Sequence, residues 1–506
     1  MTSISIGLLA IIVLYMIMML VIGFKFSKDN KNAGDFYLGG RRLGPFVTAM
    51  SAEASDMSSW LLMGLPGVAL ATGIADAGWT AIGLAIGTYL NWLIVAKKLR
   101  RYSARIDAIT IPDFFAKRFG KSKAIVGVAA LFIVVFFVPY TASGFAACGK
   151  LFGTVFGIDY ITAMIISAVV IVAYTALGGF NAASTTDFIQ SIAMTAALII
   201  VLLFGVGQAG GMDAVMNNAS KLPGYLSMFN TYSAEGNTAT PYSALTIAST
   251  LAWGLGYFGM PHVLLRFMAI DDESKLALSR RVASIWVVIS MAVAIFIGVI
   301  GYGMITKGAI APLQDAETII IQIALLLSEN GVVAIIAAGI ILSGILACTM
   351  STADSQLLAA SSSVSENIVK DVFGIKISDK VSMLVARITV IIVSVIAVIL
   401  ARDPESSVFN IVSFAWAGFG AVFGPAMLTA LFWKRVNATG TFSGMIAGGI
   451  MVFVWEYCIS PIGGIWGIYE LLPAFIVGLA VNVVVSLCTK APSKEITDIF
   501  EEVKSK

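Results

Sequence analysis

The chain has 506 residues, of which 58% are hydrophobic and 12% charged, and its formal net charge is +3. Such a composition leaves too little polar surface for a water-soluble globule of this length. The small net charge gives no signature of a nucleic-acid partner, and the four cysteines lack metal-ligand spacing. We therefore expect an all-α polytopic membrane protein with free packing thiols and no cofactor.

Apolar segments long enough to cross about 30 Å of hydrocarbon recur along the whole chain. We predict thirteen transmembrane helices, including three that Gly, Pro or hydroxyl residues interrupt. The first segment lacks a basic N-terminal region, so we interpret it as a retained span rather than a cleaved signal. The predicted centres are Tyr15, Ser58, Ala85, Phe137, Ile171, Leu198, Gly254, Ala292, Leu342, Val393, Phe419, Gly448 and Val477.

The basic residues divide unevenly between the two sets of loops. With the N-terminus outside the cell, 28 of the 32 Lys and Arg residues fall in predicted inner loops and in the tail that begins at Lys490. The predicted outer loops hold only Lys150, Lys221, Lys307 and Arg402. Since short cytoplasmic loops carry excess positive charge, this division predicts an outside N-terminus and an inside C-terminus.

The second predicted span contains a polar stretch at residues 51–60, SAEASDMSSW, with two carboxylates and four hydroxyls. A charged side chain in mid-bilayer costs roughly 2.5–3.5 kcal/mol on insertion scales, and a bound ion, a partner charge or a water-filled cavity usually compensates it. We therefore interpret this stretch as an ion and solute site. Residues 64–67, GLPG, follow it and predict a broken helix.

The segments between the spans are too short for a soluble catalytic or signalling domain. We expect the longest outer loops, at about residues 208–240 and 306–330, to form short helices and turns. On the inner side, Thr110 followed by Pro112 predicts the start of a connector helix.

A second interrupted span lies at residues 253–262, WGLGYFGMPH, five predicted spans after the first. Paired broken spans in corresponding positions of two repeats indicate a transporter's central site, although Gly and Pro can also serve helix packing alone. We predict an inverted repeat of five plus five helices. The predicted parts are 1–43 (first span and cytoplasmic loop), 44–208 (first repeat), 209–242 (extracellular loop), 243–433 (second repeat), 434–489 (last two spans) and 490–506 (cytoplasmic tail).

The ninth predicted span carries several hydroxyls at residues 348–356, CTMSTADSQ. Ser351 and Thr352 offer oxygen atoms that suit a hard monovalent cation. Ser and Thr in membrane helices also bond back to their own helix, so this segment alone leaves both interpretations open.

Four segments together resemble the sodium:solute symporter family, and within it the proline branch. They are SAEASDMSSWLLMGLPG (51–67), WGLGYFGMPHVLLRFMA (253–269), MSTADSQLL (350–358) and SFAWAGFGAVFGPAML (413–428). The resemblance covers nearly the whole chain. It implies a symporter in the plasma membrane of a bacterium, which imports L-proline with sodium by alternating access and catalyses no reaction.

The resemblance also implies site residues. Sodium would lie between the break in the second span and the hydroxyls of the ninth, and Asp56 aligns with an acidic residue that sodium-dependent transport requires. Its implied ligands are the carbonyls of Ala54, Met57 and Cys348 and the hydroxyls of Ser351 and Thr352. The implied proline pocket comprises Ser58, Trp60, Tyr140, Trp253, Tyr257 and Pro261. Aromatic faces suit a pyrrolidine ring, and helix ends and hydroxyls suit its charged groups.

Three positions depart from the family pattern. Ser59 stands where many members have Gly, which adds a hydroxyl close to the implied pocket. Cys348 stands where Ala is common, which is harmless if only its carbonyl is used. Glu53 stands where relatives have Gly or another polar residue, so its role stays open.

Further polar residues are candidates for a gate or for a second ion site. Arg41 aligns with a basic residue at the inner end of the second span. Asp187 and Asp354 could serve a second sodium site, although we favour a hydrogen bond at the cytoplasmic gate. His262, the only histidine, could relay protons, although we favour a packing or gate role.

Two rival functions remain open from the residues. A proton-coupled carrier, or one of broader specificity for amino acids and compatible solutes, would use Asp56 or Glu53 as a titrating relay. A solute sensor of the same fold normally has a long cytoplasmic extension, whereas the tail after Lys490 is short.

Overall fold

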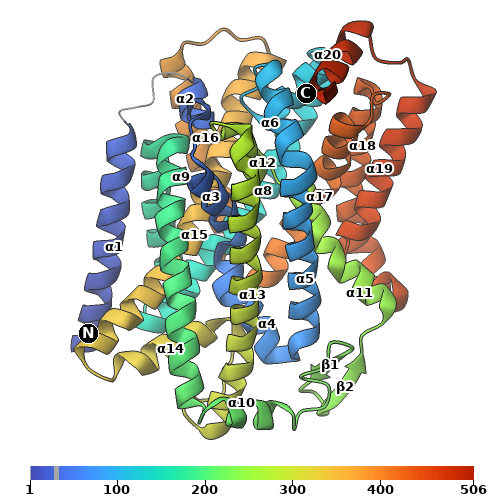
Figure 1. Cartoon of the computed structure of the whole chain (residues 1–506). Helices are drawn as coiled ribbons and strands as arrows, with labels where there is room; N and C mark the ends of the chain where they lie inside the picture. The colour runs from blue at the N-terminus through green and yellow to red at the C-terminus, as the bar shows by residue number, and fades with distance from the viewer. Residues whose placement is uncertain (1, 28–32, 506) are drawn as a thin grey trace.

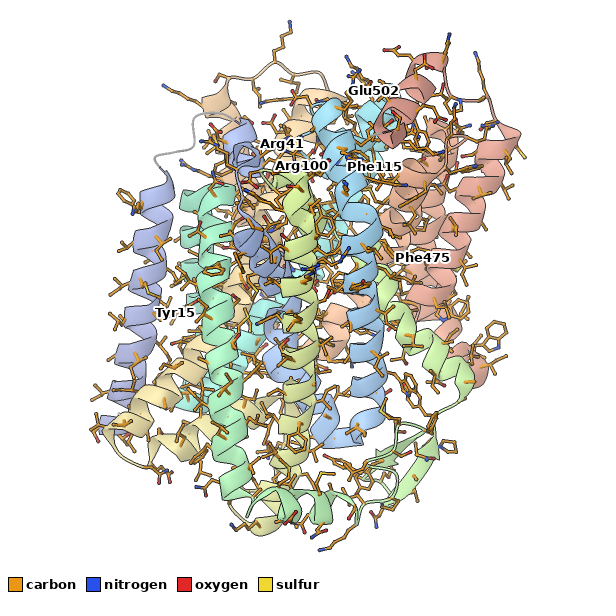
Figure 2. All side chains as sticks on the ribbon, viewed as in Figure 1. Tyr15, Arg41, Arg100, Phe115, Phe475 and Glu502 are labelled. Atoms are coloured by element: carbon orange, nitrogen blue, oxygen red, sulfur yellow. The ribbon has the colours of Figure 1, made fainter. Side chains whose placement is uncertain are left out.

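The computed structural model describes residues 2–27 and 33–505, and these form a bundle of long helices that run between two faces (Figure 1). Within the described residues, ten helices are long and apolar enough to cross a membrane. Side chains fill the spaces between the helices and project from the periphery (Figure 2). The protein is mostly helical and has several helices that could span a membrane, as expected, but it also has one two-stranded sheet, and the count of thirteen spans stays a prediction.

The helices of the first half are α1 (Ser3–Ser27), α2 (Ala33–Leu38), α3 (Pro45–Ser59), α4 (Leu65–Thr72), α5 (Ile74–Leu90), α6 (Ala96–Arg105), α7 (Ile111–Arg118), α8 (Lys123–Phe156), α9 (Tyr160–Gln208) and α10 (Met212–Ala219). Those of the second half are α11 (Ala244–Leu251), α12 (Pro261–Ala269), α13 (Leu276–Lys307), α14 (Ile319–Ser328), α15 (Val332–Ser362), α16 (Asp379–Leu400), α17 (Val408–Phe432), α18 (Ala438–Val454), α19 (Leu471–Cys488) and α20 (Lys494–Ser505).

The two faces are named by what they carry (Figure 1). The C-terminal face carries α2, α6 and α20, and the hairpin face carries α10 and the antiparallel strands β1 (Asn230–Ser233) and β2 (Thr238–Pro241). Gly236 and Asn237 take positive φ in the turn between the strands. The expected short helices of the long loops are present as α10 and α14, but the expectation omitted the two strands.

The second predicted span is broken, as the sequence suggests. α3 ends where Ser58 takes φ 48° and ψ −170°, and a π-helical segment, Trp60–Gly64, leads into α4. Pro66 lies in the first turn of α4, and the residues before it, Gly64 and Leu65, keep helical φ and ψ. The break therefore lies at Ser58 and not at the proline.

The seventh predicted span is broken in a similar way. α11 continues into a 3₁₀ segment, Ala252–Phe258, and Met260 has an extended backbone before Pro261 begins α12. Gly87 of α5 packs directly against the backbone of Gly254, where an added Cβ would collide with the Gly254 carbonyl. The absence of a Cβ at both residues allows this close approach of two backbones.

The fifth and sixth predicted spans both lie in α9, which is interrupted at Gly179, where φ is 70° and ψ is −177°, outside helical values. Gly179–Gln208 is one of the ten long apolar helices, and Tyr160–Ala173, before the interruption, is a shorter apolar helix. The expected connector helix is also present, since the Thr110 hydroxyl accepts a hydrogen bond from the Asp113 N–H at 3.1 Å and begins α7.

Candidate functional site

The end of α3 exposes backbone carbonyls in the centre of the protein. The Tyr140 hydroxyl of α8 donates to the Asp56 carbonyl at 2.8 Å, and the Ser58 hydroxyl accepts from the Trp60 N–H at 3.1 Å. These side chains replace part of the helical hydrogen bonding that is lost at Ser58. The carbonyl of Met57, in the same turn, faces the Trp60 N–H.

α15 brings hydroxyls to this break. The Ser351 hydroxyl lies 2.8 Å from the Ala54 carbonyl and 3.1 Å from the Cys348 carbonyl. Thr352, one residue on, is buried, and its hydroxyl has no hydrogen-bond partner among the described residues. The contacts thus bring together three of the five oxygen donors that the resemblance implies, those of Ala54, Cys348 and Ser351, from two helices almost three hundred residues apart in the chain.

The Asp56 carboxylate points from α3 to the second break. Its Oδ2 accepts a hydrogen bond from the Tyr257 hydroxyl at 2.6 Å, and its Oδ1 is buried with no partner in the described part of the chain. Tyr257 belongs to the 3₁₀ segment between α11 and α12. Asp56 therefore links the two broken helices.

An aromatic cavity lies beside the break. It has a volume of about 10 Å³ and is lined by Asp56, Met57, Trp60, Leu84, Tyr140, Trp253, Val412 and Trp416. Of the residues expected in a solute pocket, Trp60, Tyr140 and Trp253 line this cavity. Tyr257 packs edge-on against Trp416 at 5.0 Å between ring centroids, whereas Ser58, Ser59 and Pro261 do not contribute to the lining.

A cluster of rings closes over Trp253. Its centroid lies 5.6 Å from that of Trp60, 5.5 Å from that of Phe409 and 5.1 Å from that of Tyr469. The Tyr469 hydroxyl donates to the Ser413 carbonyl at 2.8 Å and fixes that ring. In the loop before α19, burial raises the pKa of the Glu470 carboxyl to about 8, so this group is mostly uncharged at neutral pH.

An ion cluster near the hairpin face fastens α17 to α8. The Lys150 ammonium contacts the carboxylates of Glu317 and Asp315, each at 2.7 Å. Glu317 also accepts hydrogen bonds from the N–H groups of Val408 and Phe409 at 3.0 Å, so it caps the N-terminus of α17. The sequence analysis missed this cluster, although a lone Lys at the end of an apolar span was a signal.

Glu317→Gln is expected to loosen the hairpin face, because a neutral amide loses the ion pair and half of the acceptor capacity. We expect the alkylation rate of a cysteine introduced at Phe409 to rise about tenfold, which corresponds to 1.4 kcal/mol. Asp213→Asn is the matched control, because Asp213 is an exposed carboxylate in the first turn of α10 on the same face and is not a member of this cluster. Equal labelling rates in the parent and Glu317→Gln proteins would refute this role for Glu317.

A buried polar network lies on the other side of the aromatic cavity. Arg266 of α12 pairs with Asp187 of α9 at 3.1 Å and donates to the hydroxyls of Ser51 and Ser355 at 3.0 and 2.5 Å. Ser51 in turn donates to Asp187 at 2.7 Å. The network joins α3, α9, α12 and α15, and Asp354 lies next to it through Ser355 at 3.4 Å. Sequence analysis treated Arg266 only as an inner-loop charge.

Arg41 belongs to the C-terminal face. Its guanidinium donates to the carbonyls of Met268 and Ala108, each at 2.6 Å, and to Ser103 at 3.1 Å. Beside it, the backbone of Leu43 exchanges hydrogen bonds with residues 269 and 271. Arg41 therefore ties the entry to α3 to the end of α12 and is separate from the central break.

His262 and Glu53 are buried close to the centre. His262 packs against the rings of Phe137 and Tyr140, and neither ring nitrogen has a hydrogen-bond partner among the described residues. Glu53 accepts a hydrogen bond from the Trp92 indole at 3.0 Å through Oε1, while Oε2 is unpartnered within the same residues.

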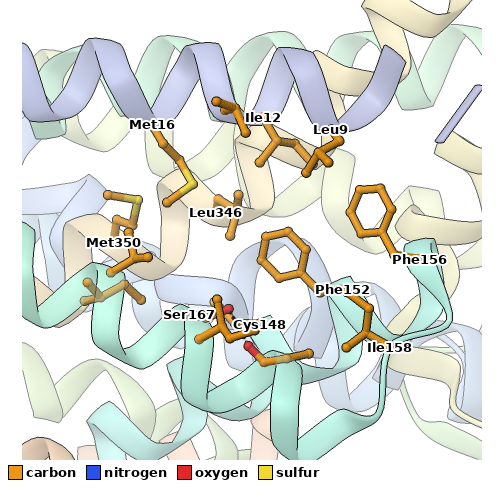
Figure 3. A pocket seen from close by; sticks show the side chains of 15 residues that line it. Leu9, Ile12, Met16, Cys148, Phe152, Phe156, Ile158, Ser167, Leu346 and Met350 are labelled. Carbon is orange, nitrogen blue, oxygen red and sulfur yellow. Dashed lines mark hydrogen bonds between the residues drawn. The ribbon is translucent and has the colours of Figure 1, made fainter. Parts of the chain in front are cut away.

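A large apolar cavity is separate from these polar groups (Figure 3). It has a volume of about 350 Å³ and lies between α1, α8, α9 and α15, with Met16, Phe152 and Met350 among its lining residues. Apart from Cys148 and Ser167, the side chains around it are apolar. Such a lining suits hydrocarbon and not an ion or a zwitterion.

A profile of the sodium:solute symporter family matches residues 36–448. The chain belongs to this family. A Bacillus subtilis (strain 168) protein named osmoregulated proline transporter OpuE is 40% identical over 98% of this chain and 98% of its own length. The high-affinity proline transporter PutP of the same strain is 42% identical over 96% and 98%. A sodium/proline symporter of Staphylococcus aureus is 38% identical over 97% and 95%.

Two solved structures resemble this family member in fold. A Na⁺-coupled sialic acid symporter in a substrate-bound outward-open state has a TM-score of 0.77, covers 96% of this chain and 99% of its own, and is 16% identical. A closed conformation of Mhp1, a nucleobase-cation-symport-1 family transporter, has a TM-score of 0.55, with coverages of 94% and 99% and 13% identity. The broken-helix bundle is therefore a transporter fold.

Proposed function

We propose that this protein imports L-proline together with sodium across the plasma membrane of a bacterium by alternating access. The observation that carries the proposal is the meeting of two broken helices, α3–α4 and α11–α12, at unpartnered oxygens beside an aromatic cavity. The names of the bacterial relatives supply the solute and the ion. The proposed architecture has thirteen spans, a five-plus-five inverted repeat, and the hairpin face outside the cell.

Sodium is proposed to bind where α3 meets α15. Ala54, Met57 and Cys348 would supply carbonyl oxygens, and Ser351 and Thr352 would supply hydroxyls. A hard monovalent cation suits an all-oxygen set of this kind. Asp56 contributes its negative charge from the same turn of α3 and, through Tyr257, joins the ion site to the second broken helix. Sodium binding would then favour one arrangement of the two breaks over the other.

Proline is proposed to bind within the aromatic rings of Trp60, Tyr140 and Trp253, with Tyr257 and the turn at Ser58 and Ser59 at its edge. The ring faces suit the pyrrolidine carbons. Pro261, the first residue of α12, leaves the N-terminal end of that helix near the pocket, where the helix dipole favours a carboxylate. The present cavity is about 10 Å³, so the aromatic cover must separate to admit the solute.

The gates are proposed to lie on either side of this pocket. Lys150 and Glu317 hold the hairpin face, and Arg41, Asp187 and Arg266 hold the C-terminal face. Asp354 stays a candidate for the gate or for an ion site near Asp187. With one sodium ion per solute, 100 mV supplies about 2.3 kcal/mol and a tenfold sodium gradient about 1.4 kcal/mol, which together support an accumulation on the order of 500-fold.

Trp253→Ala is expected to raise the proline concentration for half-maximal uptake about 30-fold, since a central aromatic anchor is typically worth about 2 kcal/mol or more. Trp286→Ala is the matched control, because Trp286 of α13 donates to the Thr195 hydroxyl of α9 and does not line the aromatic cavity. Initial rates of labelled proline uptake at saturating sodium measure both variants. If Trp253→Ala had the same half-maximal proline concentration as the parent protein, Trp253 would not be part of the proline pocket.

The test of the proposed function is uptake of labelled proline into proteoliposomes that contain this protein alone. An imposed sodium gradient should drive accumulation, and a proton gradient should not. Uptake driven by the proton gradient only would support a proton-coupled carrier with Asp56 or Glu53 as the relay. Competition by other amino acids or compatible solutes would indicate broader specificity, and solute binding without transport would support a sensor.

A further inference from the structure

The apolar cavity in Figure 3 extends along the inner side of α1. Its volume is about 350 Å³, and an apolar cavity of about 150 Å³ is already large enough to hold benzene. The α1 residues that line it recur at the spacing of one helix face and cover two turns, about 10 Å; they are Leu9, Ile12, Val13 and Met16. The cavity can therefore hold an elongated molecule that lies parallel to α1.

Helices α8 and α15 form the opposite wall of the cavity. Cys148, Leu346 and Met350 line it and are at most 3% exposed. Phe152 projects from α8 into the space between this wall and α1 (Figure 3). Because the wall is buried, a lipid on the outer surface of the protein cannot touch it. Only a molecule inside the cavity can contact these side chains.

The cavity opens at the periphery of the bundle. Val13, Ile158 and Ile166 line it and are 43%, 40% and 56% exposed. Val13 belongs to α1, which lies at the edge of the bundle and is itself a candidate membrane span, and Ile166 belongs to the first part of α9 (Figure 1). These exposed apolar side chains face the hydrocarbon of the bilayer, so the cavity is open to lipid between α1 and α9.

The lining offers almost nothing to a polar ligand. No Asp, Glu, Lys, Arg or His side chain lines the cavity within residues 2–27 and 33–505. The Ser167 hydroxyl already donates to the Ala163 carbonyl at 2.8 Å, and the Cys148 thiol is only a weak donor. A buried water needs several polar partners, so the cavity does not suit water. If it were empty, its wall would lose packing contacts, which a hydrocarbon chain would restore.

We propose that this cavity binds one acyl chain of a membrane phospholipid, with the end of the chain near Met350. Ile158 marks the other end of the cavity, in the short loop after α8, and the exposed Asp159 follows it (Figure 3). The lipid head group can stay at this polar boundary while the chain enters between α1 and α9. Met350 directly precedes Ser351, so the chain contacts the turn of α15 that also reaches α3.

The test uses the purified full-length protein in phosphatidylcholine vesicles, in which a small share of the lipid carries a photoreactive diazirine at the end of one acyl chain. After illumination, mass spectrometry of the peptides should locate cross-links at Leu346 and Met350 in the parent protein. Ala163→Phe places a ring in the cavity and should lower the yield at these two residues about tenfold. Ile165→Phe is the matched control, because Ile165 is 44% exposed on the same helix and does not line the cavity. It should keep the yield of the parent.

A second variant keeps the test decisive if the first does not fold. Val170→Phe narrows the same cavity from another position and should lower the same cross-links. Cross-links only at exposed residues such as Val13 and Ile166 would indicate lipid on the outer surface alone and would overturn the proposal. Equal yields at the buried wall in the parent and the cavity variants would overturn it too. Labelling of the wall by a photoreactive alkane, but not by the phospholipid, would assign the cavity to a free apolar molecule and contradict a lipid chain. None of these results depends on sodium or proline.

Discussion

Replacing Arg266 by Gln is expected to destabilise the folded protein by about 3–5 kcal/mol, because the change leaves a buried carboxylate without its cation. The side chain of Arg266 is 2% exposed and that of Asp187 is fully buried. Ser51 and Ser355 would remain as neutral partners, but hydroxyls do not offset a full charge in a medium that excludes water. We expect a lower midpoint of thermal unfolding in detergent, measured with a dye or by intrinsic fluorescence.

Removing the charges of Asp187 and Arg266 together should lower the stability of the folded protein much less than removing that of Arg266 alone. The pair Asp187→Asn/Arg266→Gln leaves no uncompensated ion, so most of the lost stability should return. Arg101→Gln is a suitable control, because the Arg101–Glu273 pair is partly exposed and should contribute less than about 1 kcal/mol. If the double variant were as unstable as Arg266→Gln, repulsion or strain elsewhere, and not the unpaired charge, would explain the loss.

The broken helices could be predicted because local chemistry determines them. Pro261 cannot continue a preceding helix, and polar residues at 51–60 are costly in an apolar span unless the chain uses them. The first break lies at Ser58, inside this polar stretch, and not at Pro66, which the helix accommodates. Both breaks are present in the structure. The start of α7 at Thr110 follows equally from a capping side chain and a proline. These features depend on a few neighbouring residues and need no knowledge of the fold.

The partners of the polar residues could not be predicted in the same way. Ser351 reaches Ala54, and Lys150 reaches Glu317, only because helices distant in the chain pack together. Counting charges assigned Lys150 and Arg266 to loops. Hydropathy locates a membrane span, but it does not show how deep in the protein a residue lies or which helix its side chain faces. Long-range packing decides both contacts.

Loss of the Ser351 and Thr352 hydroxyls should have the largest effect on sodium dependence. A contact between a polar group and a charge is worth about 1.5–3 kcal/mol, so the pair Ser351→Ala/Thr352→Ala should raise the half-saturating sodium concentration about 100-fold or more. Asp56→Asn should also weaken sodium activation, since it removes the charge beside the proposed ion site. Initial rates of proline uptake as a function of sodium, corrected for protein abundance, measure both effects.

The same helix offers a matched control for these hydroxyls. Ser361 and Ser362 are also adjacent and buried on α15, but each donates to its own helix, at the carbonyls of residues 358 and 359. Ser361→Ala/Ser362→Ala therefore removes two hydroxyls without touching α3, and sodium activation should not change. The proposed ion site requires at least one of these groups. If Ser351→Ala/Thr352→Ala and Asp56→Asn both kept the sodium dependence of the parent protein, sodium would therefore bind elsewhere. Loss of sodium activation in Ser351→Ala/Thr352→Ala, but not in Ser361→Ala/Ser362→Ala, would instead indicate that sodium binds where the broken helix α3 meets α15.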